Sequence, residues 1–432
     1  MPLVKTAKHI ILVLILGVLV FPSVQNTIIP IPPSVLQGVD PPDSVPDFPW
    51  KTWYNAEERS DYNKAVEENV GLRSYLIKLR NQVDFSLLNF TEAPGVVIGK
   101  EGCLFIESYI NNYTGLTFKG TAKIDYEISK LEAIQFELKK RNIDFLLVFA
   151  PGKATFNAEN IPDRYKMKPM SNYGYYTKRI ARSGINFIDM NGWFKKMKNK
   201  TSYPLYSKGG VHWTSYGVGL AADSMFRYIE KLRNIDLPEF GWDQVEVSDS
   251  LRYSDNDACE LMNLFFPPYY GPMPYPKFRY DANGKTRPHV MTIGDSYWWG
   301  FASTGITENV FSQDNYWFYN KVIFLNGKKI NSVSDVSLKE EINKQDLLIM
   351  IVTEATYELF PYGFIEAFFT RYLSYWEADK SILMEIKTEE IKQNPQWYQS
   401  IVEKAEKNKI PVEEQLKRDV QYLVEQQESV KK

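Results

Sequence analysis

Apolar positions along the chain follow two recurring patterns. In residues 121–141 they recur every three or four positions, which predicts a helix with one buried face. Residues 143–149 are apolar without alternation, which is typical of a strand covered on both faces. Both patterns then return, and they predict helices at residues 173–183, 215–233, 338–343 and 364–372 and strands at 186–189, 290–293, 322–325 and 347–352. This alternation predicts an α/β fold in which helices flank a mainly parallel sheet.

Other stretches carry weaker patterns. One helix is expected at residues 56–85, and two short strands joined by a Gly-Lys-Glu-Gly turn are expected at 96–105. Residues 236–280 show no clear period, which predicts an irregular insertion. The C-terminal residues are charged with amphipathic spacing, which predicts a small helical appendix.

The N-terminus has the pattern of an export signal. Lys5 and Lys8 precede an apolar run at residues 10–21, as in a signal peptide or an uncleaved membrane anchor. No clean small-x-small cleavage site follows, so we favour an anchor, with a cleaved signal peptide as the alternative. Either one predicts export, with the body of the protein in the periplasm or outside the cell. The predicted segments are a signal anchor at 1–29, a proline-rich stalk at 30–55, the main domain at 56–376 and a C-terminal helical segment at 377–432.

The strand predicted at residues 290–293 ends abruptly in Gly294-Asp295-Ser296. Gly294 permits a tight turn, and Asp295 can hold that turn through side-chain hydrogen bonds. The hydroxyl of Ser296 would then lie beside the backbone N–H groups that open the next helix, which form a suitable oxyanion site. Ser296 is therefore a candidate nucleophile, and the alternative is that it only caps this helix.

A nucleophilic serine needs a base, and the chain has 3 histidines. His9 lies in the N-terminal apolar segment. His289 begins the strand that leads to Ser296, and at about 3.3 Å per residue it lies roughly 20 Å away, at the wrong end. His212 remains, in a loop that leads into an amphipathic helix. Elimination therefore makes His212 the candidate base.

Polar residues follow several of the predicted strands. Lys153, Asp189, Ser296 and Glu354 all stand at or just beyond a strand's carboxyl end. Because parallel strands bring these ends to one edge of the sheet, where such folds keep their active sites, the four residues are expected along that edge.

The composition of the chain limits the classes of function that are expected. The net charge is −2 with both signs interspersed, which argues against a nucleic-acid-binding surface. Aromatic residues make up 15% of the chain, and Trp213, Tyr297 and Trp298 lie at the two motifs, where they could stack against sugar rings. Cys103 and Cys259 lie far apart, so no metal site is expected, although the two cysteines could form one disulfide in an oxidising compartment.

Four motifs in order resemble the AlgX/AlgJ branch of the SGNH-hydrolase-like proteins. Residues 97–105 resemble its Gly-Lys-x-Gly-Trp-Leu-Phe motif, with Cys103 in place of the tryptophan, and residues 147–153 resemble its Ala-Pro-x-Lys motif. The pair His212-Trp213 and the triplet Gly294-Asp295-Ser296 complete the set, which covers residues 69–372. Four spaced motifs are more specific than any one of them.

The resemblance implies an exported or membrane-anchored O-acetyltransferase that modifies a polysaccharide. Ser296 would be the nucleophile and His212 the base, with an acetyl group as the expected acyl group of the donor and no cofactor. Apart from the resemblance, Lys153, Trp213, Tyr297 and Trp298 are expected to contact the substrate because of their positions at the motifs and the sheet edge. The resemblance also implies a membrane-bound acyltransferase partner that delivers the acyl group. Two other functions stay open. The protein could be a carbohydrate esterase with the same Ser-His site, or a carbohydrate-binding scaffold whose catalytic site is impaired.

One departure from the family pattern affects the chemistry. The family has Asp-x-His-Trp, and here Gly210 stands where the aspartate that orients the histidine is expected. Another carboxylate could replace it, with Glu354 the first choice and Asp189 the second. A backbone carbonyl or water could also suffice, which would give a slower Ser-His dyad. The third possibility is an impaired enzyme that serves as a binding module.

Overall fold

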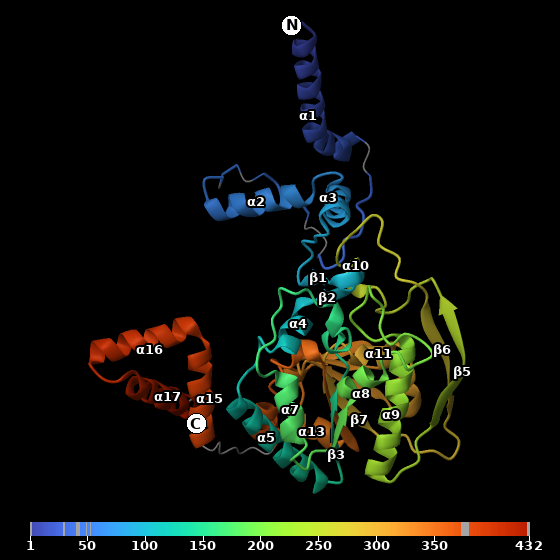
Figure 1. Cartoon of the computed structure of the whole chain (residues 1–432), viewed down its shortest axis with the longest axis vertical. Helices are drawn as coiled ribbons and strands as arrows, with labels where there is room; N and C mark the ends of the chain where they lie inside the picture. The colour runs from blue at the N-terminus through green and yellow to red at the C-terminus, as the bar shows by residue number, and fades with distance from the viewer. Residues whose placement is uncertain are drawn as a thin grey trace. The chain divides into compact units, whose positions relative to one another are not determined.

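The computed structural model describes residues 2–28, 31–39, 44–48, 50, 51, 53–372 and 380–429. The chain forms two compact units, one of Met1–Ile98 with Asp257–Tyr269 and one of Gly99–Asn256 with Tyr270–Lys432. Figure 1 labels many of the helices and strands of both. The predicted boundaries at residues 29/30 and 376/377 lie outside the described residues.

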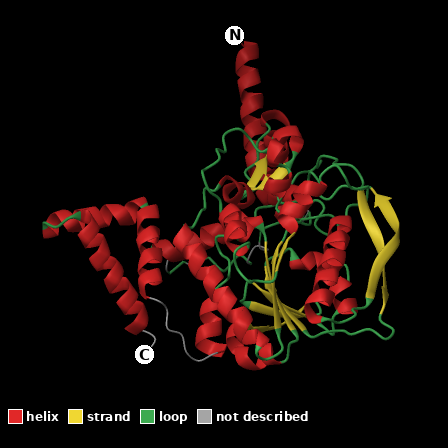
Figure 2. Ribbon diagram, turned by 60° about the horizontal axis from the view of Figure 1, so that its bottom comes forward, coloured by secondary structure: helices red, strands yellow, loops and turns green. Residues whose placement is uncertain are grey.

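A seven-stranded sheet forms the centre of the second unit (Figure 2). Its strand order is β10-β9-β8-β7-β11-β3-β4, and the strands from β8 to β4 run parallel, while β9 and β10 are antiparallel to their neighbours. The strands are β3 (Asp144–Phe149), β4 (Phe187–Asp189), β7 (Val290–Gly294), β8 (Asp314–Phe318), β9 (Val322–Leu325), β10 (Lys328–Ser332) and β11 (Leu347–Val352). The prediction of a mainly parallel sheet is confirmed.

Helices cover both faces of this sheet (Figure 2). The predicted helices are present as α5 (Thr121–Lys139), α7 (Asn172–Ile180), α9 (Ser215–Arg233) and α13 (Leu338–Asn343). The buried apolar stripe of α5 packs in one cluster with alternate residues of β3, which are Phe145, Leu147 and Phe149. The residues between them are also fully buried and point to the opposite face, as in a strand covered on both sides.

Short elements connect the sheet and its helices. Before α9 they are η1 (Lys100–Gly102), β2 (Leu104–Ile106), α4 (Glu107–Thr114), α6 (Lys153–Phe156), η2 (Ala158–Asn160) and α8 (Met190–Met197). After β7 they are α11 (Trp298–Ser303), α12 (Ile306–Val310), η3 (Val333–Asp335), η4 (Glu354–Thr356), α14 (Phe364–Ala367) and the π-helical turn η5 (Phe368–Tyr372).

The insertion predicted to be irregular contains a long antiparallel pair, β5 (Glu239–Ser248) and β6 (Met273–Asp281). The prediction was wrong because the register shifts between Trp242 and Val245, which breaks the alternation of apolar and polar residues. Phe240 and Trp242 nevertheless contact the ring of Phe278 across the pair, Trp242 in an edge-to-face arrangement. The hairpin therefore has its own aromatic contacts.

The C-terminal helical appendix is present as α15 (Lys380–Gln393), α16 (Pro395–Asn408) and α17 (Val412–Ser429). These helices share a small hydrophobic core of Ile391, Ile401, Leu416 and Val420. A salt bridge joins Lys123 of α5 to Glu390 of α15 at 3.2 Å.

The first unit contains α1 (Pro2–Ile28), α2 (Ala56–Glu68), α3 (Arg73–Leu88), β1 (Val96–Ile98) and α10 (Asp257–Glu260). The single helix expected at residues 56–85 is two helices, because Leu72 adopts a left-handed conformation with φ +60° that a helix cannot contain. Within the described part of the chain, no helix has both the length and the apolar character to cross a membrane. The membrane anchor stays a prediction.

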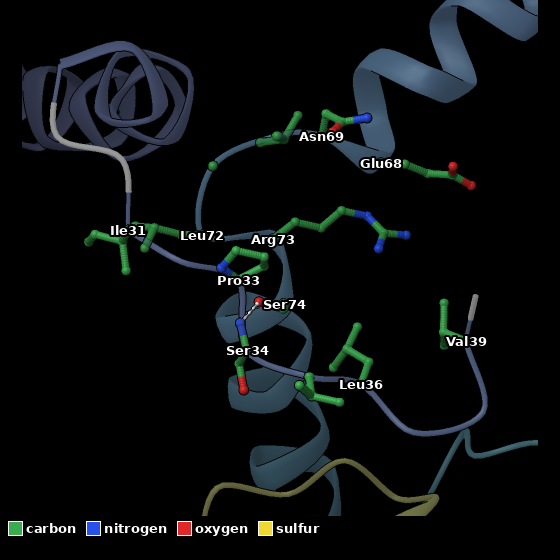
Figure 3. A pocket seen from close by; sticks show the side chains of 13 residues that line it. Ile31, Pro33, Ser34, Leu36, Val39, Glu68, Asn69, Leu72, Arg73 and Ser74 are labelled. Atoms are coloured by element: carbon green, nitrogen blue, oxygen red, sulfur yellow. Dashed lines mark hydrogen bonds between the residues drawn. The ribbon is translucent and has the colours of Figure 1, made fainter. Parts of the chain in front are cut away.

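A pocket of about 400 Å³ lies in the first unit, between the extended residues 31–36 and the start of α3 (Figure 3). Ser34 N–H donates to Ser74 Oγ at 2.8 Å, which ties the extended segment to the helix. This part of the predicted stalk therefore packs against α3.

Candidate active site

The structure brings the candidate nucleophile and base together. His212 Nε2 and Ser296 Oγ are 2.9 Å apart, within hydrogen-bonding distance, and both side chains are partly exposed. Ser296 follows the carboxyl end of β7, and His212 lies in the loop before α9. This is the distance at which an imidazole can accept the proton of a serine hydroxyl.

A buried carboxylate fixes the turn that presents Ser296. Asp295 Oδ2 accepts hydrogen bonds from Thr353 N–H at 2.8 Å, Thr353 Oγ1 at 2.7 Å and Thr356 Oγ1 at 2.6 Å. Gly294 permits the close approach, because a Cβ atom there would lie 2.7 Å from the carbonyl oxygen of Ile351. Asp295 therefore anchors the turn to the end of the neighbouring strand β11.

Three aromatic residues at the motifs lie in the protein interior. Trp213 is 3% exposed, and Tyr297 and Trp298 are fully buried. Tyr297 donates its hydroxyl to the carbonyl of Val211 at 2.8 Å, and Trp298 Nε1 donates to Asp314 Oδ1 at 2.9 Å. Burial leaves these rings without a free face for a sugar, so the expected stacking role does not suit them. Tyr297 instead supports the backbone beside His212.

Lys153 is also buried, although it was expected to contact the substrate. Its ammonium donates to the carbonyl oxygens of Ser207 at 2.7 Å, Lys208 at 3.0 Å and Gly210. We call residues 207–212 the histidine loop. The positively charged ammonium of Lys153 holds this loop through its carbonyl oxygens. This geometry suits a residue that positions His212 rather than one that touches substrate.

The backbone of another segment packs against Gly210. A Cβ atom at this position would lie 2.7 Å from the carbonyl oxygen of Asp255 and closer still to that of Ser254. Ordinary contacts of this kind are about 3.5 Å or longer. Position 210 therefore has no room for a side chain.

The two carboxylates proposed to replace the missing acid make other contacts. Glu354 is buried and accepts hydrogen bonds from the Thr155 N–H at 3.0 Å and from the Thr155 hydroxyl. Asp189 caps α8 through Gly192 N–H at 2.8 Å and accepts the Tyr173 hydroxyl, also at 2.8 Å. Both lie at the edge of the sheet where they were expected, and both stabilise neighbouring backbone or side chains there.

Burial raises the pKa of the Glu354 carboxyl to about 7, although hydrogen bonds from Thr155 act in the opposite direction. The folded state therefore binds more protons than the unfolded chain between pH 4.5 and 7. Parent stability is thus expected to fall across this window by about 3 kcal/mol, the free energy of a shift of about 2.5 pKa units. Glu354→Gln should remove this part of the slope.

Urea unfolding of the parent and Glu354→Gln at several pH values measures the difference. Equal pH dependence in the two proteins would contradict the prediction. The same variant reports on catalysis, because a carboxylate that orients His212 could not be replaced by an amide without a large loss of rate. We expect Glu354→Gln to retain most of the parent's acylation rate.

Some site residues had no signal in the sequence. Thr353 and Thr356 bind Asp295, and the Tyr206 hydroxyl lies 3.0 Å from that of Tyr297. Their positions beyond strand ends or in a long loop are common to many polar residues. Their roles depend on tertiary contacts that no local pattern encodes.

Both cysteines are buried thiols, so the disulfide that the sequence left open is not formed. Burial raises the pKa of the Cys103 thiol, and the positive charges of Lys153 and Lys208 partly oppose this effect. Cys103 occupies the position of the family's tryptophan, where it serves as a packing residue.

Comparison with known proteins gives a consistent set of relatives. Residues 96–252 match the model of the SGNH hydrolase-like domain of acetyltransferase AlgX. A curated protein from Pseudomonas aeruginosa, the probable alginate O-acetylase AlgJ, is 24% identical over 146 residues, which are 34% of this chain and 36% of that protein. The chain thus spans about a third of the length of this relative, and the family match includes His212 but ends before Ser296.

Two solved structures are similar at low identity. The O-acetyltransferase domain of Pseudomonas putida AlgJ has a TM-score of 0.41 and 13% identity, over 63% of this chain and 98% of that one. Pseudomonas aeruginosa AlgX has a TM-score of 0.39 and 18% identity, over 60% of this chain and 62% of that one.

Proposed function

We propose that this chain is an exported O-acyltransferase that acetylates polysaccharide hydroxyls, because residues 96–252 match the SGNH hydrolase-like domain of acetyltransferase AlgX and part of the chain is similar to AlgJ. The observation that carries the proposal is the 2.9 Å distance between His212 Nε2 and Ser296 Oγ at the carboxyl edge of the sheet. The N-terminal apolar segment supports export, and a membrane-bound acyltransferase is the proposed source of the acyl group.

The proposed reaction proceeds in two steps. His212 Nε2 takes the proton of Ser296 as Oγ attacks the carbonyl carbon of the donor ester, and the leaving oxygen then receives that proton. The backbone N–H of Ser296 and its neighbours hold the oxyanion. His212 next removes the proton of a sugar hydroxyl, whose oxygen attacks the acyl-serine, and the proton returns to Ser296. The bond from the acyl carbon to Ser296 breaks as the new ester forms.

The test uses the full chain with an activated acetyl ester and an oligosaccharide acceptor. Alginate oligosaccharide is the first choice, because the curated relative from Pseudomonas aeruginosa is named a probable alginate O-acetylase. Intact-mass spectrometry should show one acetyl group on the protein, and added acceptor should remove it while gaining acetyl itself.

Other outcomes favour the alternative functions. Loss of the adduct to water at a rate that no acceptor changes would identify an esterase. A protein that binds oligosaccharide but forms no adduct would support the binding scaffold. Either result would refute transfer to a sugar as the main activity.

A further inference from the structure

A second group of aromatic residues lies beside Ser296, and these side chains are partly exposed, unlike the buried rings of the motifs. They are Trp299 of α11, Phe318 at the end of β8 and Tyr319 just beyond it. Their rings form one row, because the centroid of the Phe318 ring is 6.2 Å from that of Trp299 and 4.4 Å from that of Tyr319. All of these residues belong to the second unit.

The backbone places this aromatic row next to the nucleophile. β7 and β8 are parallel neighbours in which Gly294 pairs with Phe318, so the carboxyl ends of the two strands lie about 4.8 Å apart. The Tyr319 N–H donates to the carbonyl of Gly294 at 2.8 Å. The Trp299 N–H donates to the carbonyl of Ser296 at 3.1 Å, and a turn of this kind brings side chains three positions apart to one side of the chain. The row therefore lies against the turn that carries Ser296.

The backbone at the end of the row has an unusual conformation. Tyr319 and Asn320 are both left-handed, with φ +50° and φ +54°. A bulky residue adopts this conformation rarely, and residues held in it cluster at functional sites. The loop is held in place because Asn320 Nδ2 donates to the carbonyl of Tyr362 at 3.2 Å and the Tyr319 ring contacts the Tyr362 ring edge-on.

The row also carries hydrogen-bond donors that the protein does not use. In the described part of the chain, no hydrogen bond engages the Tyr319 hydroxyl or the Trp299 Nε1–H. Trp298 Nε1 and the Tyr316 hydroxyl, by contrast, both donate to groups in the protein interior. The Tyr319 phenol stays protonated at neutral pH, because burial, with a smaller contribution from the charge of Asp295, raises the pKa of Tyr319 to about 12.

Partly exposed rings with unused donors suit a sugar. A pyranose ring presents C–H groups on one face, which pack on an aromatic ring, and hydroxyl oxygens at its rim, which accept hydrogen bonds. We propose that Trp299, Phe318 and Tyr319 form the platform that binds the acceptor sugar beside Ser296. The rings would pack against the C–H face, and the Tyr319 hydroxyl and the Trp299 Nε1–H would donate to sugar oxygens. This inference rests on the proposed acyl transfer to a polysaccharide.

Tyr319→Ala and Trp299→Phe test the platform in the full chain, with Tyr165→Ala and Trp193→Phe as matched controls. Both control residues are partly exposed, like the residues they match. Tyr165 donates its hydroxyl to Glu107 Oε1 at 2.8 Å, and Trp193 lies in α8, which follows β4, the third strand from β7. Isothermal titration calorimetry with oligosaccharides of alginate, cellulose and chitin measures acceptor binding without any need for activity. The rate of acylation by the activated ester is measured separately, with no acceptor present.

Tyr319→Ala is expected to weaken binding of the oligosaccharide that the parent prefers about tenfold or more. Tyr319→Phe and Trp299→Phe, which keep a ring but lose a donor, should weaken it about fivefold. The rate of Ser296 acylation should stay at the parent's value in all three, because the platform holds the acceptor and not the donor. The controls should match the parent in both measurements, and urea unfolding confirms that each variant is folded.

The remaining outcomes separate this inference from the proposed function. Variants that bind the oligosaccharides as tightly as the parent would overturn the platform, and so would a parent that binds none of them. A raised KM for the activated ester with unchanged acceptor binding would assign the row to the donor and would also overturn it. A parent that binds an oligosaccharide through these residues but forms no acetyl adduct would refute the acyl transfer and keep the platform.

Discussion

Replacing Ser296 by alanine is expected to abolish the acetyl adduct and to lower acetyl transfer by at least about a thousandfold. The structure places this hydroxyl 2.9 Å from His212 Nε2, within hydrogen-bonding distance. Alanine removes the nucleophile and leaves the anchoring carboxylate of Asp295 in place, so the fold should be unchanged. Intact mass after incubation with the activated ester measures the adduct, and transfer is followed on the acceptor.

The matched control is His212→Ala, alone and combined with Ser296→Ala. Because nucleophile and base act as one unit, the double variant should be no slower than Ser296→Ala. An adduct that survives in Ser296→Ala would place the nucleophile elsewhere. Losses that multiply in the double variant would mean that the two residues act independently.

Restoring the family's aspartate, in Gly210→Asp, is expected to impair the protein rather than improve it. The new Cβ atom would lie 2.7 Å from the carbonyl oxygen of Asp255, so either the histidine loop or the 254–255 backbone must move. Overpacking of this kind costs about 1–3 kcal/mol, and a shift of about 1 Å at a catalytic group costs about a hundredfold in rate. Urea unfolding and the acylation rate measure the two effects.

Gly241→Asp is the control for the same substitution elsewhere. A Cβ atom at Gly241 meets nothing within 4 Å, and its cross-strand neighbour is Arg279. This variant should keep the parent's stability and acylation rate. If Gly210→Asp were instead as active as the parent, or more active, the histidine loop would be able to move to make room for the aspartate. The aspartate could then orient His212 from position 210.

The elements that the sequence predicted well are those with a strong period. The stripe of α5 and the apolar runs of β3 and β11 lie in the core, where burial demands that spacing. β8 was missed because it begins with Asp314 and Asn315, two polar residues that are nevertheless buried. Tertiary contacts such as the bond from Trp298 to Asp314 compensate for that burial, and no local pattern reveals them.

The candidate site was predictable only in part. Ser296 and His212 could be paired because the chain has 3 histidines and two of them are poorly placed. The positions of Lys153 and Glu354 at the sheet edge followed from the strand pattern, but their partners did not. Whether an aromatic ring or an ammonium faces solvent depends on tertiary packing, which the local sequence does not show. The expectation that Trp213, Tyr297, Trp298 and Lys153 face the substrate therefore did not anticipate their burial.

The reactive pair also has a consequence for how the chain matures. His212 and Ser296 are 84 positions apart in sequence, and the turn that carries Ser296 is anchored through Asp295 to Thr353, which lies later still in the chain. Contacts of such long range form only after the entropy of closing the loop has been overcome, and this makes them late events in folding. A nascent or partly folded chain therefore contains a serine without its base. On the proposed mechanism, Ser296 would gain its base only once the sheet is complete, and this order would protect folding intermediates from premature acylation.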